Sequence, residues 1–389
     1  MRRFPPARPI SLRAIGFPIR ASCRAARRLK CWRSPVANQA STVTLTVGGT
    51  RHEGWTRINV TRSIDALAGS FDLTLATAWA ESPAPFVLEA GAACTVSIGG
   101  ETLITGYIDR LSPSFDSEAH SITISGRDKS GDLIDCAAIA SPGTWRDTKI
   151  STILTAIAKP YGVKIILSAD EGAPLRRFSL QPGETVQAAI ERLCRFRGLL
   201  AIPNAQGDIE LTTPNAGAPA EVLTQGGNIV SASGEHDVSG RFSEYIVKGQ
   251  SSGDDRAHGK TVSAPHANAK DPAIKRHRPM VIIAEEQATL AGLQTRARWE
   301  ASTREGKGQS ANVQLQGWYR PDGKLRDRNT IVMLGAPHLF MDGRMLVQSC
   351  SYILDEGGTR TELIVVPPSA WSQLPVPEKA EVSRVGRRR

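Results

Sequence analysis

The residues best suited to chemistry lie in one polar stretch. His258-Gly259-Lys260-Thr261 has the form of half a phosphate-binding loop, whose backbone N–H groups cradle a phosphate at the start of a helix. That motif needs four residues between its glycines, but five separate Gly253 from Gly259. Pro265 interrupts the chain where the helix would begin. The spacing therefore argues against nucleotide binding.

Three histidines in or beside this stretch suggest a metal site: His258, His266 and His277. Metal ligands need rigid placement and supporting hydrogen bonds, and histidines separated by prolines and a polar loop have neither. His236-Asp237 is more typical of a turn than of an acid–base pair. We therefore predict no metal site.

Acidic pairs are no better as catalytic candidates. Asp254-Asp255 and Glu285-Glu286 are adjacent pairs, more simply explained by solubility and by charge at a helix start than by glycosidase chemistry. The sequence has neither a G-x-S-x-G elbow nor an H-E-x-x-H motif. We assign no catalytic, cofactor-binding or metal-binding residue, expect no cofactor, and predict that the protein is not an enzyme.

The cysteines are scattered, with no C-x-x-C pair to suggest zinc or a disulfide framework. We expect reduced and mostly buried thiols in a protein made in a cytoplasm. The six are Cys23, Cys31, Cys94, Cys136, Cys194 and Cys350.

The net charge of +10 comes from one end of the chain. Residues 1–40 contain ten Arg and Lys and no acid, and the rest of the chain carries equal numbers of both signs. Nucleic-acid binding by the folded part thus loses its main support. The head could be a targeting segment, a basic arm, or sequence upstream of a natural start near Val36. We prefer the third, because the head has no amphipathic period.

The elements that would position any site are mostly strands, and one strand pattern occurs twice. Each copy predicts a meander of three strands with turns at matching places. The first copy comprises Thr95–Gly99, Leu103–Asp109 and His120–Gly126, and the second Thr330–Gly335, Leu346–Leu354 and Thr361–Val366. A high content of Gly and Pro fits a turn-rich β protein, and no apolar run is long enough to span a membrane.

These patterns predict an α+β, mainly β fold with two similar small β-barrel modules flanking a compact α+β insert. In the insert, Ile150, Ile153, Leu154 and Ile157 mark one helix face, and a second helix with Val186, Ala189, Ile190 and Leu193 inward ends at Gly198. The predicted organisation is a basic head (1–40), a first β module (41–136), the insert (137–215), a second β module (216–368) with a polar loop (250–275), and a flexible tail (369–389).

One fragment suggests cell-wall binding. Phe178–Ile190 resembles the opening of a LysM repeat, with a strand, a turn and a helix. A LysM repeat needs a second helix soon afterwards, whereas a β-hairpin is predicted after Gly198. Peptidoglycan binding or cell-wall processing stays as the alternative function.

Three stretches together resemble the baseplate hub proteins of Mu-like contractile-tailed bacteriophages and the related late control D proteins. They follow the family's order and span most of the chain after the head. They are Leu103–Asp109 with Gly126–Cys136, then Asp271–Met280 with Arg298–Glu300, and then Gly317-Trp318 with Gly357–Leu363 and Pro367-Pro368. The turn Leu325–Arg328 departs from the family's pattern, which leaves the contacts of that loop open.

The resemblance implies a homotrimeric structural hub in the tail baseplate of a virion or prophage particle, made in the cytoplasm of the host bacterium. Its partners would be a separate tail-spike protein, the tail tube and other baseplate proteins, with no small-molecule substrate and no membrane span. Three chains with two similar modules each would give six modules in a ring, which could stack on a sixfold tube while matching a threefold spike.

Overall fold

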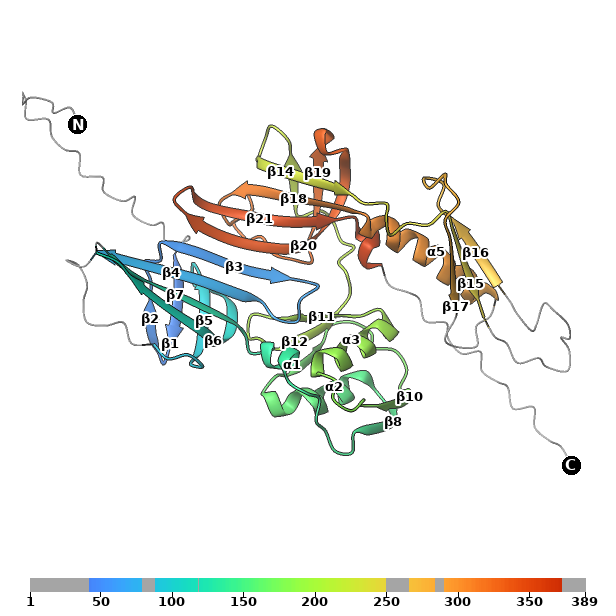
Figure 1. The fold of residues 1–389 in the computed structure, drawn as a ribbon, viewed down its shortest axis with the longest axis horizontal. Coiled ribbons are helices and arrows are strands. Elements are labelled where there is room, and N and C mark those ends of the chain that lie inside the picture. Colours follow the sequence, from blue (N-terminus) through green and yellow to red (C-terminus); the bar gives the residue numbers. More distant parts are fainter. Residues whose placement is uncertain (1–41, 79–87, 118, 250–265, 284–289, 373–389) are drawn as a thin grey trace, which may run out of the picture. The chain divides into compact units, whose positions relative to one another are not determined.

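The computed structural model describes residues 42–78, 88–117, 119–249, 266–283 and 290–372. The fold is mainly β with few helices (Figure 1). In the described part of the chain, no helix is long and apolar enough to cross a membrane. Several predicted features lie outside the described residues: the head 1–40, the motifs between 250 and 265, the Glu285-Glu286 pair, and 373–389 of the predicted tail.

The first β module consists of strands joined by antiparallel ladders in the order β3-β4-β7-β6-β5-β1-β2. Apolar residues alternate along these strands, so that Phe71 and Leu73 of β4, for example, are buried while Asp72 is exposed. The strands are β1 (Val43–Val47), β2 (Thr50–His52), β3 (Arg57–Ser63), β4 (Ser70–Ala78), β5 (Ala93–Ile98), β6 (Glu101–Phe115) and β7 (Ala119–Asp128).

The second β module has the pairing order β14-β18-β21-β20-β19-β13. A short 3-10 helix, η4 (Pro337–Leu339), connects β19 to β20. The strands are β13 (Glu221–Thr224), β14 (Ile229–His236), β18 (Gln309–Gln316), β19 (Ile331–Ala336), β20 (Met341–Asp355) and β21 (Gly358–Val366). Both predicted meanders are therefore present, as β5-β6-β7 and β19-β20-β21.

The two modules have matching strand orders. Without β2, the first reads β3-β4-β7-β6-β5-β1 and the second β14-β18-β21-β20-β19-β13, and each strand has a counterpart at the same place in chain order. One ladder differs, because β1 pairs with β5 antiparallel whereas β13 pairs with β19 parallel. In the described residues no ladder joins β1 to β3 or β13 to β14, so closure of either module into a barrel stays a prediction.

The central strands of the modules share an irregularity. β6 and β20 are each 15 residues long, and each has a register shift near its middle. The shift lies between Ile108 and Arg110 in β6 and between Val347 and Ser349 in β20. Such β-bulges bend a strand and increase its twist. Each long strand therefore pairs with β5 or β19 before the bulge and mainly with β7 or β21 after it.

The insert is α+β, as predicted, with its own core. The apolar faces predicted for both helices are buried. Leu133 is also part of this core, so α1 packs with the insert and not with the first module, where the prediction placed it. The elements are α1 (Gly131–Asp135), β8 (Thr144–Thr148), α2 (Ile150–Ala158), η3 (Lys159–Tyr161), β9 (Ile165–Leu167), β10 (Leu175–Ser179), α3 (Val186–Arg197), β11 (Leu200–Pro203) and β12 (Ile209–Thr212).

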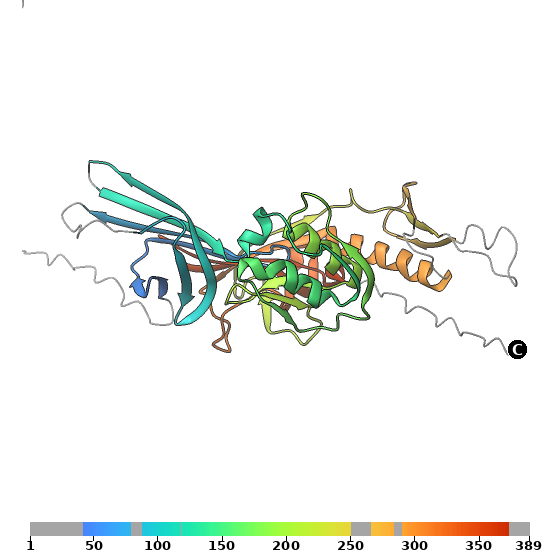
Figure 2. The same ribbon diagram turned by 90° about the horizontal axis from the view of Figure 1, so that it is seen from below.

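A small sheet interrupts the second module between β14 and β18. It has the order β16-β15-β17, and α5 packs against it (Figure 2). Its elements are β15 (Glu244–Lys248), β16 (His266–Lys270), β17 (Pro279–Ile283) and α5 (Leu290–Lys307). The predicted loop 250–275 thus contains a strand, since β16 pairs with β15 and buries Ala267 under α5.

The predicted tail also begins later than expected. Residues Pro368–Trp371 form a 3-10 helix, η5, against α5. The indole Nε1 of Trp299 donates a hydrogen bond of 2.8 Å to the carbonyl of Ser372. Pro367 and Pro368, next to the predicted tail, start a helical turn, where a missing N–H costs nothing.

One ladder joins the two modules into a 13-stranded sheet. Strand β20 pairs with β3 through Ser349–Leu354 and Ile58–Ser63, although the two strands are almost 300 residues apart (Figure 1). Apolar residues of both modules form one continuous core, with Trp318, Tyr352 and Phe71 among its largest fully buried members.

Candidate functional site

The described residues offer surfaces and junctions rather than a cleft with paired catalytic groups, and the β3–β20 junction is the most elaborate. The hydroxyls of Thr61 and Ser351 lie 2.8 Å apart across this ladder. Ser63 donates a 3.0 Å hydrogen bond to the carbonyl of Gln348, and the Gln348 amide donates to Asp65 at 2.7 Å. Side chains thus reinforce the backbone ladder along the join.

The loop Leu325–Arg328 links three parts of the chain. Asp327 accepts a 2.8 Å hydrogen bond from buried Arg62 of β3 in the first module. Arg328, also buried, donates to the carbonyl of Pro203 in the insert. This turn, which departs from the family's pattern, therefore connects the two modules and the insert.

Arg326 anchors the same loop within the second module. Its guanidinium makes a bidentate ion pair with Glu221 of β13, with both N···O distances 2.9 Å and both side chains buried. Its carbonyl accepts hydrogen bonds from Tyr352 and Cys350 of β20. Burial raises the pKa of Cys350 to about 12 and that of Tyr352 well above its usual value. Both groups therefore stay protonated at neutral pH and act as donors.

Asp128 is a buried carboxylate beside this junction. It accepts hydrogen bonds from the N–H of Gly69 at 2.7 Å and of Thr105 at 3.3 Å. Burial raises its pKa to about 6, although these hydrogen bonds and the charges of Arg62 and Arg328 act in the opposite direction. The role that fits these contacts is to hold β4 and β6 in place.

The insert is attached to the first module through the residues next to Asp128. Lys129 forms a 2.6 Å ion pair with Asp208 of the insert. The Thr105 hydroxyl donates to the carbonyl of Ala205 at 2.8 Å. Gly207 adopts a positive φ and a Cβ there would lie 2.5 Å from the Thr105 carbonyl, so a glycine is required at this contact.

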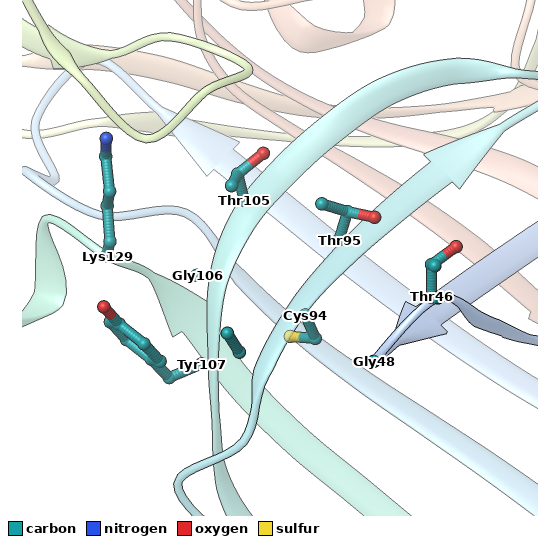
Figure 3. Close-up of a pocket in the computed structure, with 10 residues that line it drawn as sticks. Thr46, Gly48, Cys94, Thr95, Thr105, Gly106, Tyr107 and Lys129 are labelled. Carbon is teal, nitrogen blue, oxygen red and sulfur yellow. The ribbon is translucent and has the colours of Figure 1, made fainter.

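An open pocket of about 300 Å³ lies on the first module. Figure 3 shows Lys129 and Tyr107 on one side of it, Thr46 and Gly48 on the other, and Cys94 between them. Burial, aided by the charges of Asp109 and Asp128, raises the pKa of Cys94 to about 12, so its thiol is a poor nucleophile. Lys129 is engaged by Asp208. This lining brings no base beside a nucleophile.

The histidine and cysteine motifs have structural surroundings where they are described. His236 contacts the carbonyl of Leu339, while Asp237 binds the N–H and hydroxyl of Ser239, so they form no acid–base pair with each other. Among the described residues, no group of three potential ligands could hold a metal ion. The four described cysteines are free thiols, and Cys94, Cys194 and Cys350 are buried.

Several strand edges have no neighbouring strand in the described part of the chain, among them the outer edges of β14 and of the second half of β6. β14 ends the sheet and pairs with β18 alone. The second half of β6, Arg110–Ser114, pairs with β7 on one side, and its ladder with β5 ends at Tyr107. Unpaired backbone groups of this kind can receive a strand from another chain.

Comparison with known proteins accounts for most of the chain. Family models match residues 42–128 (Mu phage baseplate assembly protein GpP-like, N-terminal), 130–213 (baseplate hub protein gp44-like, second domain), 241–299 (tail protein NMB1110-like, third domain) and 289–373 (Mu phage baseplate assembly protein GpP, fourth domain). The baseplate hub protein gp44 of Escherichia phage Mu is 34% identical over 338 residues, which cover 84% of this chain and 88% of that protein. The chain belongs to the Mu gp44 family of baseplate hub proteins.

Two solved tail proteins have the same fold as this gp44-family chain. The 43 kDa tail protein of prophage MuSo2 from Shewanella oneidensis has a TM-score of 0.77 and 32% identity, covering 86% of this chain and 100% of that one. A tail protein from Neisseria meningitidis MC58 has a TM-score of 0.71 and 24% identity, covering 85% and 97%. The family resemblance predicted from the sequence is confirmed, and the protein is a structural component of the phage tail baseplate.

Sequence reasoning missed the residues that join the parts of this gp44-family chain. Arg62 of β3 and Arg326 and Arg328 of the turn are buried, whereas arginines are mostly exposed in folded proteins. The only signal was the run Leu325–Arg328, in which an apolar residue precedes three charges in a turn. The ion pair with Glu221 joins residues 105 positions apart and could not be inferred from local spacing.

Proposed function

We propose that the protein is the trimeric hub of a contractile-tail baseplate, a ring that joins the tail tube to the central spike. The observation that carries this proposal is the matching strand order of the two modules within one chain. Three copies supply six equivalent modules, so the ring presents approximate sixfold symmetry to a tube and true threefold symmetry to a spike. In each module the strands curl toward a small barrel, and the insert lies at the periphery of the ring.

The proposed role is structural, without catalysis. The gp44 protein of phage Mu is named as a baseplate hub protein, and the buried polar groups of this chain serve its internal junctions. The LysM-like fragment gives the cell-wall alternative little support, since α3 is followed by the hairpin β11–β12 and not by a second helix.

Light scattering on a sizing column tests the oligomeric state of the full chain. The proposal predicts a mass close to three times 41.8 kDa, stable on dilution into the micromolar range. A monomer at all accessible concentrations would contradict it. Co-expression with the spike gene of the same tail cluster is the second arm, and a complex of three hub chains with three spike chains is the expected result.

A further inference from the structure

The unpaired edges of β14 and of the second half of β6 correspond to the two sides of the β3–β20 junction. In the second module, β20 pairs with β3 immediately after its bulge. In the first module, β6 passes the same bulge and its Arg110–Ser114 segment has no strand on that side in the described residues. β14, the counterpart of β3, is likewise unpaired on the side away from β18.

Backbone hydrogen bonds support the equivalence of β6 and β20 residue by residue. Just before the bulge, the Ile108 N–H donates to Ala92 at 3.0 Å and its carbonyl accepts from Gly91 at 2.7 Å. In the second module, the Val347 N–H donates to the carbonyl of Thr330 and the Val347 carbonyl accepts from the N–H of Asn329, both at 2.8 Å. Ile108 therefore corresponds to Val347, and Ser112 corresponds to Ser351.

We infer that β14 of one copy pairs antiparallel with the second half of β6 in another copy, repeating the β3–β20 junction between chains. This inference rests on the proposed trimer and names its interface. We matched β14 to β3 by following the registers of β14–β18–β21 and β3–β4–β7. Gly234 then corresponds to Val60 and Glu235 to Thr61. The expected register is Leu111 with His236, Ser112 with Glu235, and Pro113 with Gly234.

The backbone of β14 is oriented for this pairing. The Asp237 N–H donates to the carbonyl of Gly308 at 2.7 Å. Because successive N–H groups along a strand point to opposite sides, this hydrogen bond determines which amides of β14 face β18. The N–H groups of Ala232, Gly234 and His236 therefore point away from β18. In the β3–β20 junction, the Ile64 N–H donates to the carbonyl of Gln348. Val238 corresponds to Ile64 and Asp109 to Gln348, so in the proposed pairing the Val238 N–H donates to the Asp109 carbonyl of the other copy.

Proline 113 modifies the edge of β6 without closing it. Pro113 corresponds to Tyr352 and has no N–H, so the ladder between copies has one hydrogen bond fewer than the β3–β20 ladder. Its carbonyl still accepts from the Gly234 N–H. A proline also discourages indiscriminate pairing of an exposed edge, which favours a specific partner strand.

Charge complementarity is consistent with the same register. Arg110 is exposed on β6 and would face Asp237 of the other copy, with Glu235 diagonally adjacent; Asp237 and Glu235 are both exposed. Val230 of β14 is 56% exposed, as expected for a strand that pairs on one side only. Because the two edges differ, each copy contacts the next head to tail, and such contacts close into a ring when the rotation allows.

A designed disulfide tests the register. We expect the full chain with Ser112→Cys and Glu235→Cys to form a covalent trimer on mild oxidation, seen on a non-reducing gel. The equivalent pair Thr61→Cys with Ser351→Cys is the positive control and should cross-link within one chain, since those hydroxyls lie 2.8 Å apart. The offset pair Ser114→Cys with Glu235→Cys and both single-cysteine variants should yield at least tenfold less trimer.

The outcomes separate this inference from the proposed function. A native trimer whose Ser112/Glu235 variant does not cross-link above the offset control overturns the β6–β14 pairing but leaves the trimeric hub intact. A native monomer overturns both. Ala232→Pro gives an independent check, because it removes an N–H at the outer edge while sparing the β18 ladder. We expect it to dissociate the trimer into folded monomers, and a stable trimer of this variant would also overturn the pairing.

Discussion

Strands β3 and β14 occupy the same place in their modules but have different surroundings. β3 pairs on both sides, with β4 and with β20, and its Arg62 is buried against Asp327. β14 pairs with β18 alone and is largely exposed, and His236, the counterpart of Arg62, lies at the surface. The difference suggests that one copy of the junction is completed within the chain and the other is left for assembly.

The largest expected effect comes from breaking the loop that supports the completed junction. Arg326→Met leaves Glu221 buried without a partner, which typically costs about 3–5 kcal/mol. Urea unfolding should show this loss. Arg360→Met, which removes the more exposed pair with Asp355, is the control and should cost less than about 1 kcal/mol. Equal losses in both variants would contradict the anchoring role of Arg326.

The next effect contrasts the two halves of β6. A Cβ on Gly106 would lie 1.9 Å from the Arg127 carbonyl, so Gly106→Ala should destabilise the protein by about 3 kcal/mol. Ser112→Ala, in the unpaired half of the same strand, should change stability by less than about 0.5 kcal/mol. Thermal unfolding of both variants measures the difference. If Ser112→Ala cost as much, the second half of β6 would be packed rather than open.

A matched pair of substitutions compares β3 with β14 directly. Arg62→Met removes the hydrogen bond to Asp327 inside the completed junction and should cost about 2 kcal/mol. His236→Met at the equivalent position should cost less than about 1 kcal/mol in unfolding measured under dissociating, dilute conditions. Similar costs would contradict the view that β3 is packed on both sides in the single chain while β14 is open on one side.

A pH dependence is expected at the first module, where Asp128 is buried. Because the pKa of Asp128 is raised to about 6 by burial, the folded protein binds this proton more tightly than the unfolded chain. Its contribution to stability is therefore present at about pH 4 and is lost as the pH rises through about 6, a change on the order of 3 kcal/mol. Asp128→Asn should remove this slope from a series of unfolding curves, and an unchanged slope would rule Asp128 out as its source.

Local patterns predicted the elements well and the long-range joins poorly. The meanders, both insert helices and their buried faces followed from apolar spacing and glycine positions. Strand β16 was missed because its segment, with alternating small and polar residues between prolines, reads as loop; its pairing with β15 and cover by α5 decide its structure. Barrel closure was not found in the described ladders, and short periodic strands do not determine it.

The candidate site was harder to predict for a related reason. Motif searches find chemistry that is local in sequence, whereas the junction joins β3, β13, the Leu325–Arg328 loop and the insert across more than 250 residues. The resemblance to a hub family identified the kind of protein, but the unpaired edges became apparent only when the ladders of both modules were aligned. A repeat in sequence thus predicted the modules, and the structure added the position where the repeat is incomplete.

Hydrogen exchange at single-residue resolution tests the central claim most directly. The amides of Ala232, Gly234 and His236 point away from β18, so their exchange reports whether another strand covers that edge. We expect slow exchange of these amides in the assembled full chain and fast exchange after dilution into monomers. In the Ala232→Pro variant, the amides of Gly234 and His236 should also exchange fast. Fast exchange at Gly234 and His236 in a verified trimer would contradict pairing through β14.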